Sequence, residues 1–202
     1  MMKKLIVISH PEVLYNEAEL LVTTLDAGSD YVHLRKPLAK DTDIAKLLQE
    51  IPPEYLSKIV LHDAHHLARE YRVAGIHLNR RHPHAVLYRQ GMVGISCHTI
   101  EEIERYKGAH DYLFLSPIHN SISKAGYNTP FTSEQLAMAY KSGIIDNQII
   151  ALGGITPDNI STTLAYGFGG IAILGCIWNN PSVEHITNTI HNIKEQLSCY
   201  SL

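Results

Sequence analysis

The sequence predicts an α/β fold, a single (β/α)₈ barrel with short loops that occupies residues 1–202. Short apolar runs alternate with segments of helical periodicity along the chain, and such alternation indicates a parallel sheet. Most runs are continuously apolar, which is typical of strands covered on both faces. No linker or low-complexity tract interrupts them. The repetition favours closure into a barrel, although the chain is short for one; the alternative is an open doubly wound sheet.

The expected strands are the apolar runs, and the segments between them carry the helix signals. Apolar stripes at helical spacing run along residues 18–25, 44–51 and 183–197. The segment near 85–87 hardly reads as a helix. Asn16, Thr99 and Thr132 stand where helix caps are expected, and Gly28, Gly143 and Gly167 where helices end. The expected strands are 5–9, 31–35, 58–62, 75–78, 92–96, 112–116, 148–152 and 170–174.

The composition is that of an ordinary soluble protein, with 45% hydrophobic and 18% charged residues. The net charge of −3 and the absence of a Lys/Arg cluster argue against a nucleic-acid partner. Three cysteines, far apart and in no metal spacing, favour a reducing cytoplasmic setting. The first apolar stretch stops at His10-Pro11, too short for a signal peptide, and no run is long enough to span a membrane.

A phosphate-binding corner is expected after the last two strands. The run 149–152 ends in Gly153 and Gly154, which let the backbone approach a ligand closely, and Thr156-Pro157 can begin the next helix. A second run ends at Leu174 and Gly175, one unit later. Loops at this place bind phosphate in many (β/α)₈ barrels. The sequence therefore predicts an enzyme of phosphorylated small molecules.

Charged and hydroxyl side chains follow other strands. Arg35 can clamp phosphate oxygens through its fork of donors, or form a surface ion pair. Asp63 suits Mg²⁺, and it also suits the N-cap of a helix near Ala64. In the long loop 116–130, Ser121, Ser123 and Lys124 suit an anionic ligand.

Several of the 13 histidines gather after the third and fourth strands, at His62, His65, His66, His82 and His84. They raise the alternative of a zinc site. Their spacing matches no zinc motif and no cysteine joins them, so zinc is disfavoured and the role of this group stays open.

Four motifs in order, each at a strand end, resemble the thiamine phosphate synthase/TenI family over nearly the whole chain. They are His33-Leu34-Arg35, the segment 94–99 (Gly-Ile-Ser-Cys-His-Thr), the Ser-Ile-Ser-Lys loop at 121–124, and the Gly-Gly-Ile-Thr corner at 153–156. The family joins a pyrimidine methyl diphosphate to a thiazole phosphate and releases diphosphate, using Mg²⁺. Its substrates are small phosphates and diphosphates, and a homodimer is possible.

The resemblance implies a role for each matching residue. Ser96 would line the pyrimidine pocket, with His33, Lys36 and His62 close to the substrates. Gly153 and Gly154 would take the thiazole phosphate, with Leu174 and Gly175 beside it. Asp63 would bind Mg²⁺. The diphosphate would be held by Arg35, Ser121, Ser123 and Lys124, and Arg35 and Lys124 would neutralise the leaving group.

The chain departs from the synthase pattern at several positions. The second metal aspartate falls at or near His82, and losing one carboxylate should weaken Mg²⁺ binding. Arg80 or Arg81 could supply fixed positive charge instead, which is a hypothesis of metal-independent diphosphate binding. The other departures are His33 for glutamine, His62 for asparagine, Pro37 for a lysine (with Lys36 adjacent) and Gly175 for serine.

These departures leave other functions open. A TenI-type thiazole tautomerase would need the phosphate corner and a general base, for which His119 or His33 would serve. A non-catalytic binder of thiamine-pathway phosphates, or a barrel enzyme of sugar or indole phosphates, would keep the corner alone. Retention of Arg35 and of the Ser-x-Ser-Lys loop favours the synthase.

Overall fold

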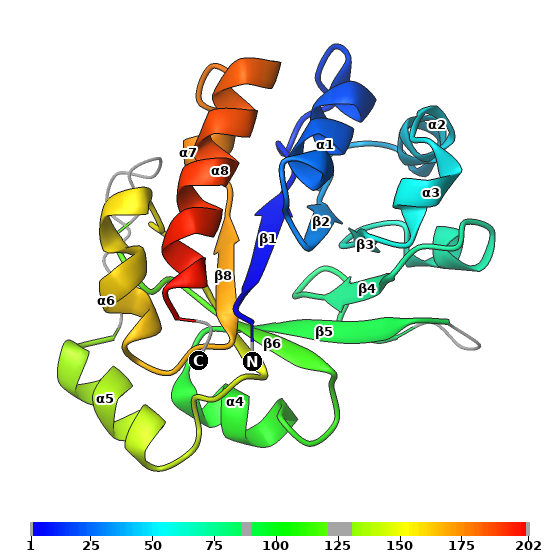
Figure 1. Cartoon of the computed structure of the whole chain (residues 1–202). Coiled ribbons are helices and arrows are strands. Elements are labelled where there is room, and N and C mark those ends of the chain that lie inside the picture. Colours follow the sequence, from blue (N-terminus) through cyan, green and yellow to red (C-terminus); the bar gives the residue numbers. More distant parts are fainter. Residues whose placement is uncertain (1, 86–89, 121–130, 201–202) are drawn as a thin grey trace.

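The computed structural model describes residues 2–85, 90–120 and 131–200 as one closed barrel of parallel strands, β1 to β8 in chain order (Figure 1). The strands are β1 (Lys4–Ile8), β2 (Tyr31–Leu34), β3 (Ile59–Leu61), β4 (Gly75–Leu78), β5 (Met92–Cys97), β6 (Tyr112–Leu115), β7 (Ile149–Leu152) and β8 (Gly170–Ile173). The helices are α1 (Glu17–Asp26), α2 (Asp41–Glu50), α3 (Pro53–Leu56), the 3₁₀ helix η1 (His65–Arg69), α4 (Ile100–Tyr106), α5 (Ser133–Lys141), the 3₁₀ turn η2 (Pro157–Asn159), α6 (Ile160–Leu164), α7 (Gly175–Trp178) and α8 (Val183–Ser198).

The barrel closes where β1 pairs with β8, with Leu5 opposite Ile171. Every expected strand is present, and each observed end lies within one residue of the expected one. The prediction of a (β/α)₈ barrel is therefore confirmed, and the open sheet is excluded.

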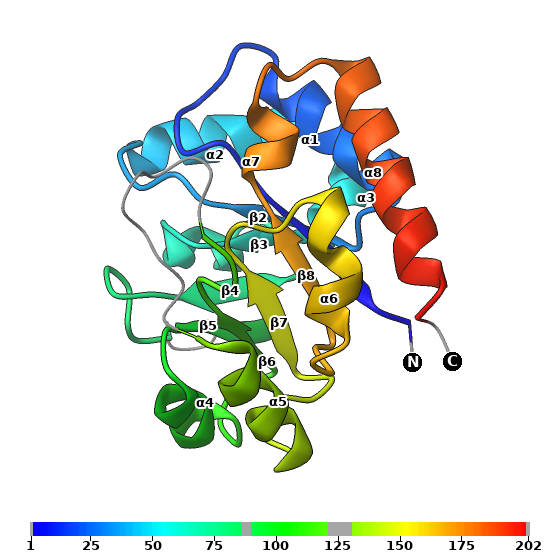
Figure 2. The ribbon, with the colours of Figure 1, turned by 90° about the vertical axis from the view of Figure 1, so that its left-hand side faces the viewer.

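Two apolar layers hold the fold together. The larger lies between the strands and the surrounding helices, which Figure 2 shows outside the barrel wall. The smaller fills part of the interior, with Ile6 and Ile8 of β1 facing Phe114 and Ile150. Gly94 of β5 has no side chain because Tyr112 lies there: a Cβ on Gly94 would come within 2.1 Å of the Tyr112 ring.

Most expected helix boundaries are confirmed. Thr132 forms a capping box with Gln135, and the Thr99 hydroxyl accepts a hydrogen bond from the backbone N–H of Glu102. The expected glycine helix ends all have positive φ. The cap at Asn16 was wrong, because Asn16 has φ 54° and its side chain makes no capping bond. The Glu17 carboxylate instead accepts from the backbone N–H of Leu14.

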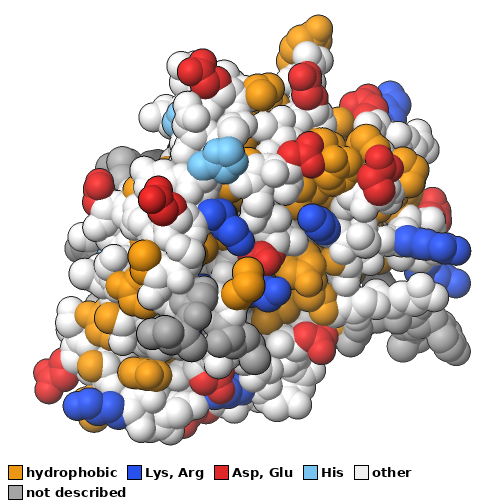
Figure 3. Space-filling view, viewed as in Figure 1, with side chains coloured by type: hydrophobic (Ala, Val, Ile, Leu, Met, Phe, Trp, Pro, Cys, Tyr) orange, Lys and Arg blue, Asp and Glu red, His pale blue; other side chains and the backbone are white. Residues whose placement is uncertain are grey.

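The surface of the described residues carries mixed charge. On the face in Figure 3, acidic and basic side chains are interspersed around apolar patches. In the part of the chain that the structure describes, no helix combines the length and apolar character needed to cross a bilayer.

Candidate functional site

The carboxyl ends of β2 to β5 bring polar side chains into and around one half of the barrel mouth. His33 lies on β2, His77 on β4 and Ser96 on β5, while His62 and Asp63 directly follow β3. His33 and His77 expose no surface, and His62 exposes 4%. This half of the interior is therefore lined by imidazoles, whereas the half near β1 and β7 is apolar.

Four of these side chains and Tyr112 of β6 form one continuous series of polar contacts. Ser96 Oγ lies 2.9 Å from His77 Nε2, and His77 Nδ1 lies 3.0 Å from the Tyr112 hydroxyl. That hydroxyl lies 3.5 Å from His33 Nε2. His33 Nδ1 lies 2.8 Å from His62 Nε2.

Hydrogen-bond donation can run in a single direction along this series of contacts when its three imidazoles are neutral. Burial lowers the pKa of His33 to about 3, and it lowers the pKa of His62 and His77 well below 6.5. A neutral imidazole donates from one nitrogen and accepts at the other. Every contact is satisfied when the hydrogens point the same way along the whole series, either from Ser96 toward His62 or in reverse.

Sequence reasoning missed His77 and Tyr112. His77 is the third residue of its strand, as His33 is in β2, and inward side chains in these barrels stack in layers contributed by alternate strands. That shared position was the available signal for His77. Tyr112 gave none, because an aromatic residue at the start of a strand is ordinary.

Asp63 is enclosed by donors rather than acting as a helix cap. Its Oδ1 accepts from Arg81, with Nη2 at 2.8 Å and Nε at 3.3 Å, and lies 3.4 Å from His82 Nε2. Its Oδ2 accepts from the backbone N–H of Lys36 at 2.8 Å. The following helix η1 has Ala64 at its cap position and no side-chain cap bond, so the interpretation of Asp63 as a helix cap was wrong.

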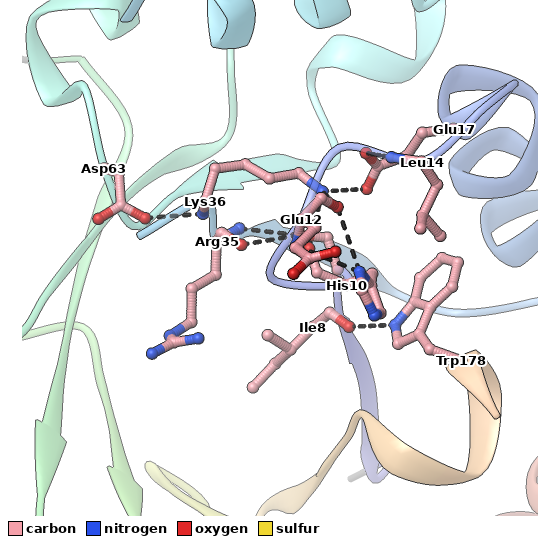
Figure 4. A network of polar contacts seen from close by, with 10 residues as sticks. Ile8, His10, Glu12, Leu14, Glu17, Arg35, Lys36, Asp63 and Trp178 are labelled. Carbon is pink, nitrogen blue, oxygen red and sulfur yellow. Dashed lines mark hydrogen bonds and ion pairs between the residues drawn. The ribbon is translucent and has the colours of Figure 1, made fainter. Parts of the chain in front are cut away.

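Arg35 and Lys36 are neighbours whose side chains run in different directions (Figure 4). The Lys36 ammonium is fully buried and contacts the Glu17 carboxylate and the carbonyls of His10 and Glu12. Lys36 therefore makes an internal ion pair, which corrects the expectation that its side chain contacts substrate. Among the described residues, no hydrogen bond or ion pair reaches the Arg35 guanidinium.

The glycine corner packs against the segment that follows β6. Gly153 and Gly154 have φ 96° and 65°. A Cβ on Gly153 would lie 2.8 Å from the Pro117 Cα, and one on Gly154 would lie 2.6 Å from the Asn120 carbonyl oxygen. Across the corner, Leu174 precedes α7, and a Cβ on Gly175 would meet no atom within 4 Å. As far as the described residues go, the corner thus has open space at Gly175 and a tight fit at the glycine pair.

His119 is held against the outer helix layer. Its Nε2 lies 2.8 Å from the hydroxyl of Thr163 on α6, and burial lowers its pKa. This contact occupies one of the two ring nitrogens of His119, and its catalytic role stays a prediction. Ser121, Ser123 and Lys124 lie outside the described residues.

Among the described residues, the other clustered histidines are not grouped with His62 as a set of zinc ligands. His65, His66, His82 and His84 line a separate cavity of about 340 Å³, together with Asp41 and Arg81. Within the described ranges, the one group of three ligand side chains with atoms inside 4.8 Å of one another is His33, His62 and His77. Those nitrogens already bond to one another, to Tyr112 or to Ser96.

Comparisons with known proteins all indicate the same family. A family model described as thiamine monophosphate synthase matches residues 5–177. The thiamine-phosphate synthase of Bacteroides thetaiotaomicron is 26% identical over 93% of this chain and 95% of its own length. That of Clostridium novyi is 25% identical over 87% and 90%.

Two solved structures of proteins with the corresponding name resemble this chain. A crystal structure of thiamine phosphate pyrophosphorylase from Bacteroides thetaiotaomicron has 33% identity and a TM-score of 0.88, covering 98% of this chain and 99% of that one. The pyrophosphorylase of Pyrococcus furiosus, at 20% identity and a TM-score of 0.78 over 98% and 97%, shares the fold. The chain belongs to the thiamine monophosphate synthase (TenI) family.

Proposed function

We propose that this chain is a thiamine-phosphate synthase, a transferase that joins hydroxymethylpyrimidine diphosphate to thiazole phosphate. In this reaction the bond between the pyrimidine methylene and the diphosphate oxygen breaks, and its electron pair leaves with diphosphate. The lone pair of the thiazole nitrogen then forms the new C–N bond. Two sequence relatives that bear the synthase name match nearly the full length of this chain, and that observation carries the proposal.

The site offers a group for each requirement of this reaction. The Arg35 guanidinium follows β2 and makes no hydrogen bond or ion pair with another described residue. It suits the diphosphate, because its donors can bind two oxygens at once. The backbone at Gly153 and Gly154 is the proposed binding site of the thiazole phosphate. Holding both substrates between these points would orient the nitrogen toward the methylene, and most of the acceleration would come from this and from leaving-group neutralisation.

Mg²⁺ is the cofactor that the family resemblance implies, and the residues present do not fit it. Mg²⁺ requires several oxygen ligands in an octahedral arrangement. Asp63 is the carboxylate expected to bind it, and both of its oxygens already accept hydrogen bonds from Arg81 and from the Lys36 backbone. The position expected to supply the second carboxylate holds His82, a nitrogen donor. No step of the proposed reaction is therefore assigned to Mg²⁺.

The test combines purified protein with hydroxymethylpyrimidine diphosphate and thiazole phosphate, with and without Mg²⁺, and measures thiamine phosphate and diphosphate. Equimolar formation of both products supports the synthase. Binding of both substrates without product would support a non-catalytic binder instead. An Arg35→Gln variant should lose most turnover, while Arg105→Gln, an exposed change on α4, should not.

The polar chain from Ser96 to His62 favours one second candidate, the thiazole tautomerase. A tautomerase moves a proton between two atoms of its substrate, and neutral imidazoles can accept and release protons. Both ring nitrogens of His33 are in hydrogen-bond contacts, whereas His62 and His119 each use only Nε2 among the described residues, so these two are the candidate bases. Proton exchange of the thiazole carboxylate phosphate with solvent, in the absence of the pyrimidine substrate, would identify this activity.

A further inference from the structure

We propose that Arg81 takes the place of a metal ion in this site, so that diphosphate binds between the guanidinium groups of Arg35 and Arg81 without Mg²⁺. This inference rests on the proposed function, because diphosphate is the leaving group of that reaction. It assigns Arg81 as a ligand of the diphosphate, with Asp63 as the residue that positions it.

The geometry at Asp63 is that of a carboxylate binding a guanidinium. Two nitrogens of Arg81 reach the same oxygen, Oδ1, while Oδ2 is used by the backbone N–H of Lys36. The Asp63 side chain exposes 8% of its surface, whereas the Arg81 side chain exposes 39%. Asp63 therefore fixes one side of the guanidinium and leaves the other donors of Arg81 accessible to an anion.

A divalent cation would have to displace this contact. It would lose the charge-assisted bonds between Asp63 and Arg81, and it would then lie beside a guanidinium of like charge. His82, 3.4 Å from the same oxygen, offers nitrogen where a hard cation prefers oxygen. The donor set thus favours the guanidinium over Mg²⁺ at this carboxylate.

Arg35 completes a positively charged pair. The pKa of Arg35 is lowered by burial and by the positive charge of Arg81, and Asp63 opposes this effect only in part. Asp63 is ion-paired to Arg81, and its charge also acts on Arg35, while Lys36 is neutralised separately by Glu17. Within the described ranges the half-buried Arg35 forms no ion pair of its own, and a diphosphate would supply a counter-charge.

Space for an anion lies next to Arg81. The cavity of about 340 Å³ that Arg81 lines is also bordered by His65, His66, His82 and His84. His65 Nε2 is buried and makes no hydrogen bond within the described residues. Imidazole N–H groups around this opening can add donors to a bound phosphoryl oxygen.

The experiment measures binding of inorganic diphosphate by calorimetry, in EDTA and then with Mg²⁺ in excess. We expect equal affinity in both. Arg81→Gln should weaken binding about tenfold to hundredfold, as expected for the loss of hydrogen bonds to a charged group. Arg80→Gln removes the same charge from the adjacent exposed residue and should leave affinity unchanged. Binding that requires Mg²⁺, or equal effects of the two variants, would overturn the inference.

A second variant separates loss of a ligand from loss of structure. Arg81→Gln combined with His82→Asp frees Asp63 and supplies a second carboxylate. This double variant should bind diphosphate only with Mg²⁺ present, a gain that damage to the fold cannot produce. If wild-type protein binds diphosphate in EDTA but forms no thiamine phosphate, the proposed function fails and this inference stands.

Discussion

His33 Nδ1 lies 2.8 Å from Nε2 of His62, inside a barrel where the two side chains expose 0% and 4% of their surface. Two protonated imidazoles could not occupy these positions, because their positive charges would repel each other in a site that excludes water. The native barrel therefore requires these rings to stay neutral, and acid should destabilise it.

The first prediction concerns this acid sensitivity. The pKa of His33 is about 3 in the folded protein, against about 6.5 in the unfolded chain. Between these values the unfolded state binds a proton that the native state does not. The free energy of unfolding should thus be largest above about pH 6.5 and fall by about 1.4 kcal/mol per pH unit for this group as pH drops toward 3.

Urea unfolding followed from pH 8 to pH 4 measures this slope. His33→Gln removes one titrating group and should give a shallower dependence, whatever its stability at pH 8. Equal slopes for the two proteins would show that His33 does not remain neutral in the fold.

The second prediction concerns the Tyr112 hydroxyl, which joins His77 to His33. Tyr112→Phe keeps the ring beside Gly94 but leaves a buried nitrogen of each histidine without its partner. The expected cost is about 1–3 kcal/mol of unfolding free energy at pH 8. Tyr55→Phe is the matched control: its hydroxyl donates to Asp26 at the surface, and its loss should cost about 0.5 kcal/mol. Similar costs for both would contradict a buried polar chain.

The strands could be predicted from the sequence because a buried parallel strand requires a continuous apolar run. The hydrogen-bond partners of the polar side chains could not be predicted in this way. His33, His62 and Tyr112 meet only because the closed barrel brings β2, β3 and β6 around one interior. Arg35 and Lys36 are adjacent cations in the sequence. Lys36 pairs with Glu17 only because the segment that leads from β1 into α1 places that carboxylate beside it. The Arg81–Asp63 pair depends likewise on the loops after β3 and β4.

The third prediction concerns the buried ion pair of Lys36 and Glu17. Burial lowers the pKa of Lys36 and raises the pKa of Glu17, so each charge is costly and depends on the other. Lys36→Met should leave the Glu17 carboxylate uncompensated and cost about 3–5 kcal/mol in urea unfolding. Combining it with Glu17→Leu should recover most of this loss. Lys4→Met, at a half-exposed pair with Asp30, should cost less than about 1 kcal/mol. A double variant no more stable than Lys36→Met would argue against the pair.

The fourth prediction concerns the glycine corner. Gly154 has φ 65°, and an alanine there costs about 1–2 kcal/mol in the left-handed region alone. Its Cβ would also lie 2.6 Å from the Asn120 carbonyl oxygen, so the segment after β6 would have to shift. Gly154→Ala should therefore lower stability by at least about 2 kcal/mol and raise KM for thiazole phosphate more than KM for the pyrimidine diphosphate. The Cβ of Gly175→Ala would meet no other described atom within 4 Å, so this variant should keep nearly unchanged stability. Thermal unfolding and steady-state kinetics on the two variants test this prediction. An equal rise of both KM values in Gly154→Ala would contradict selective binding of the thiazole phosphate at this corner.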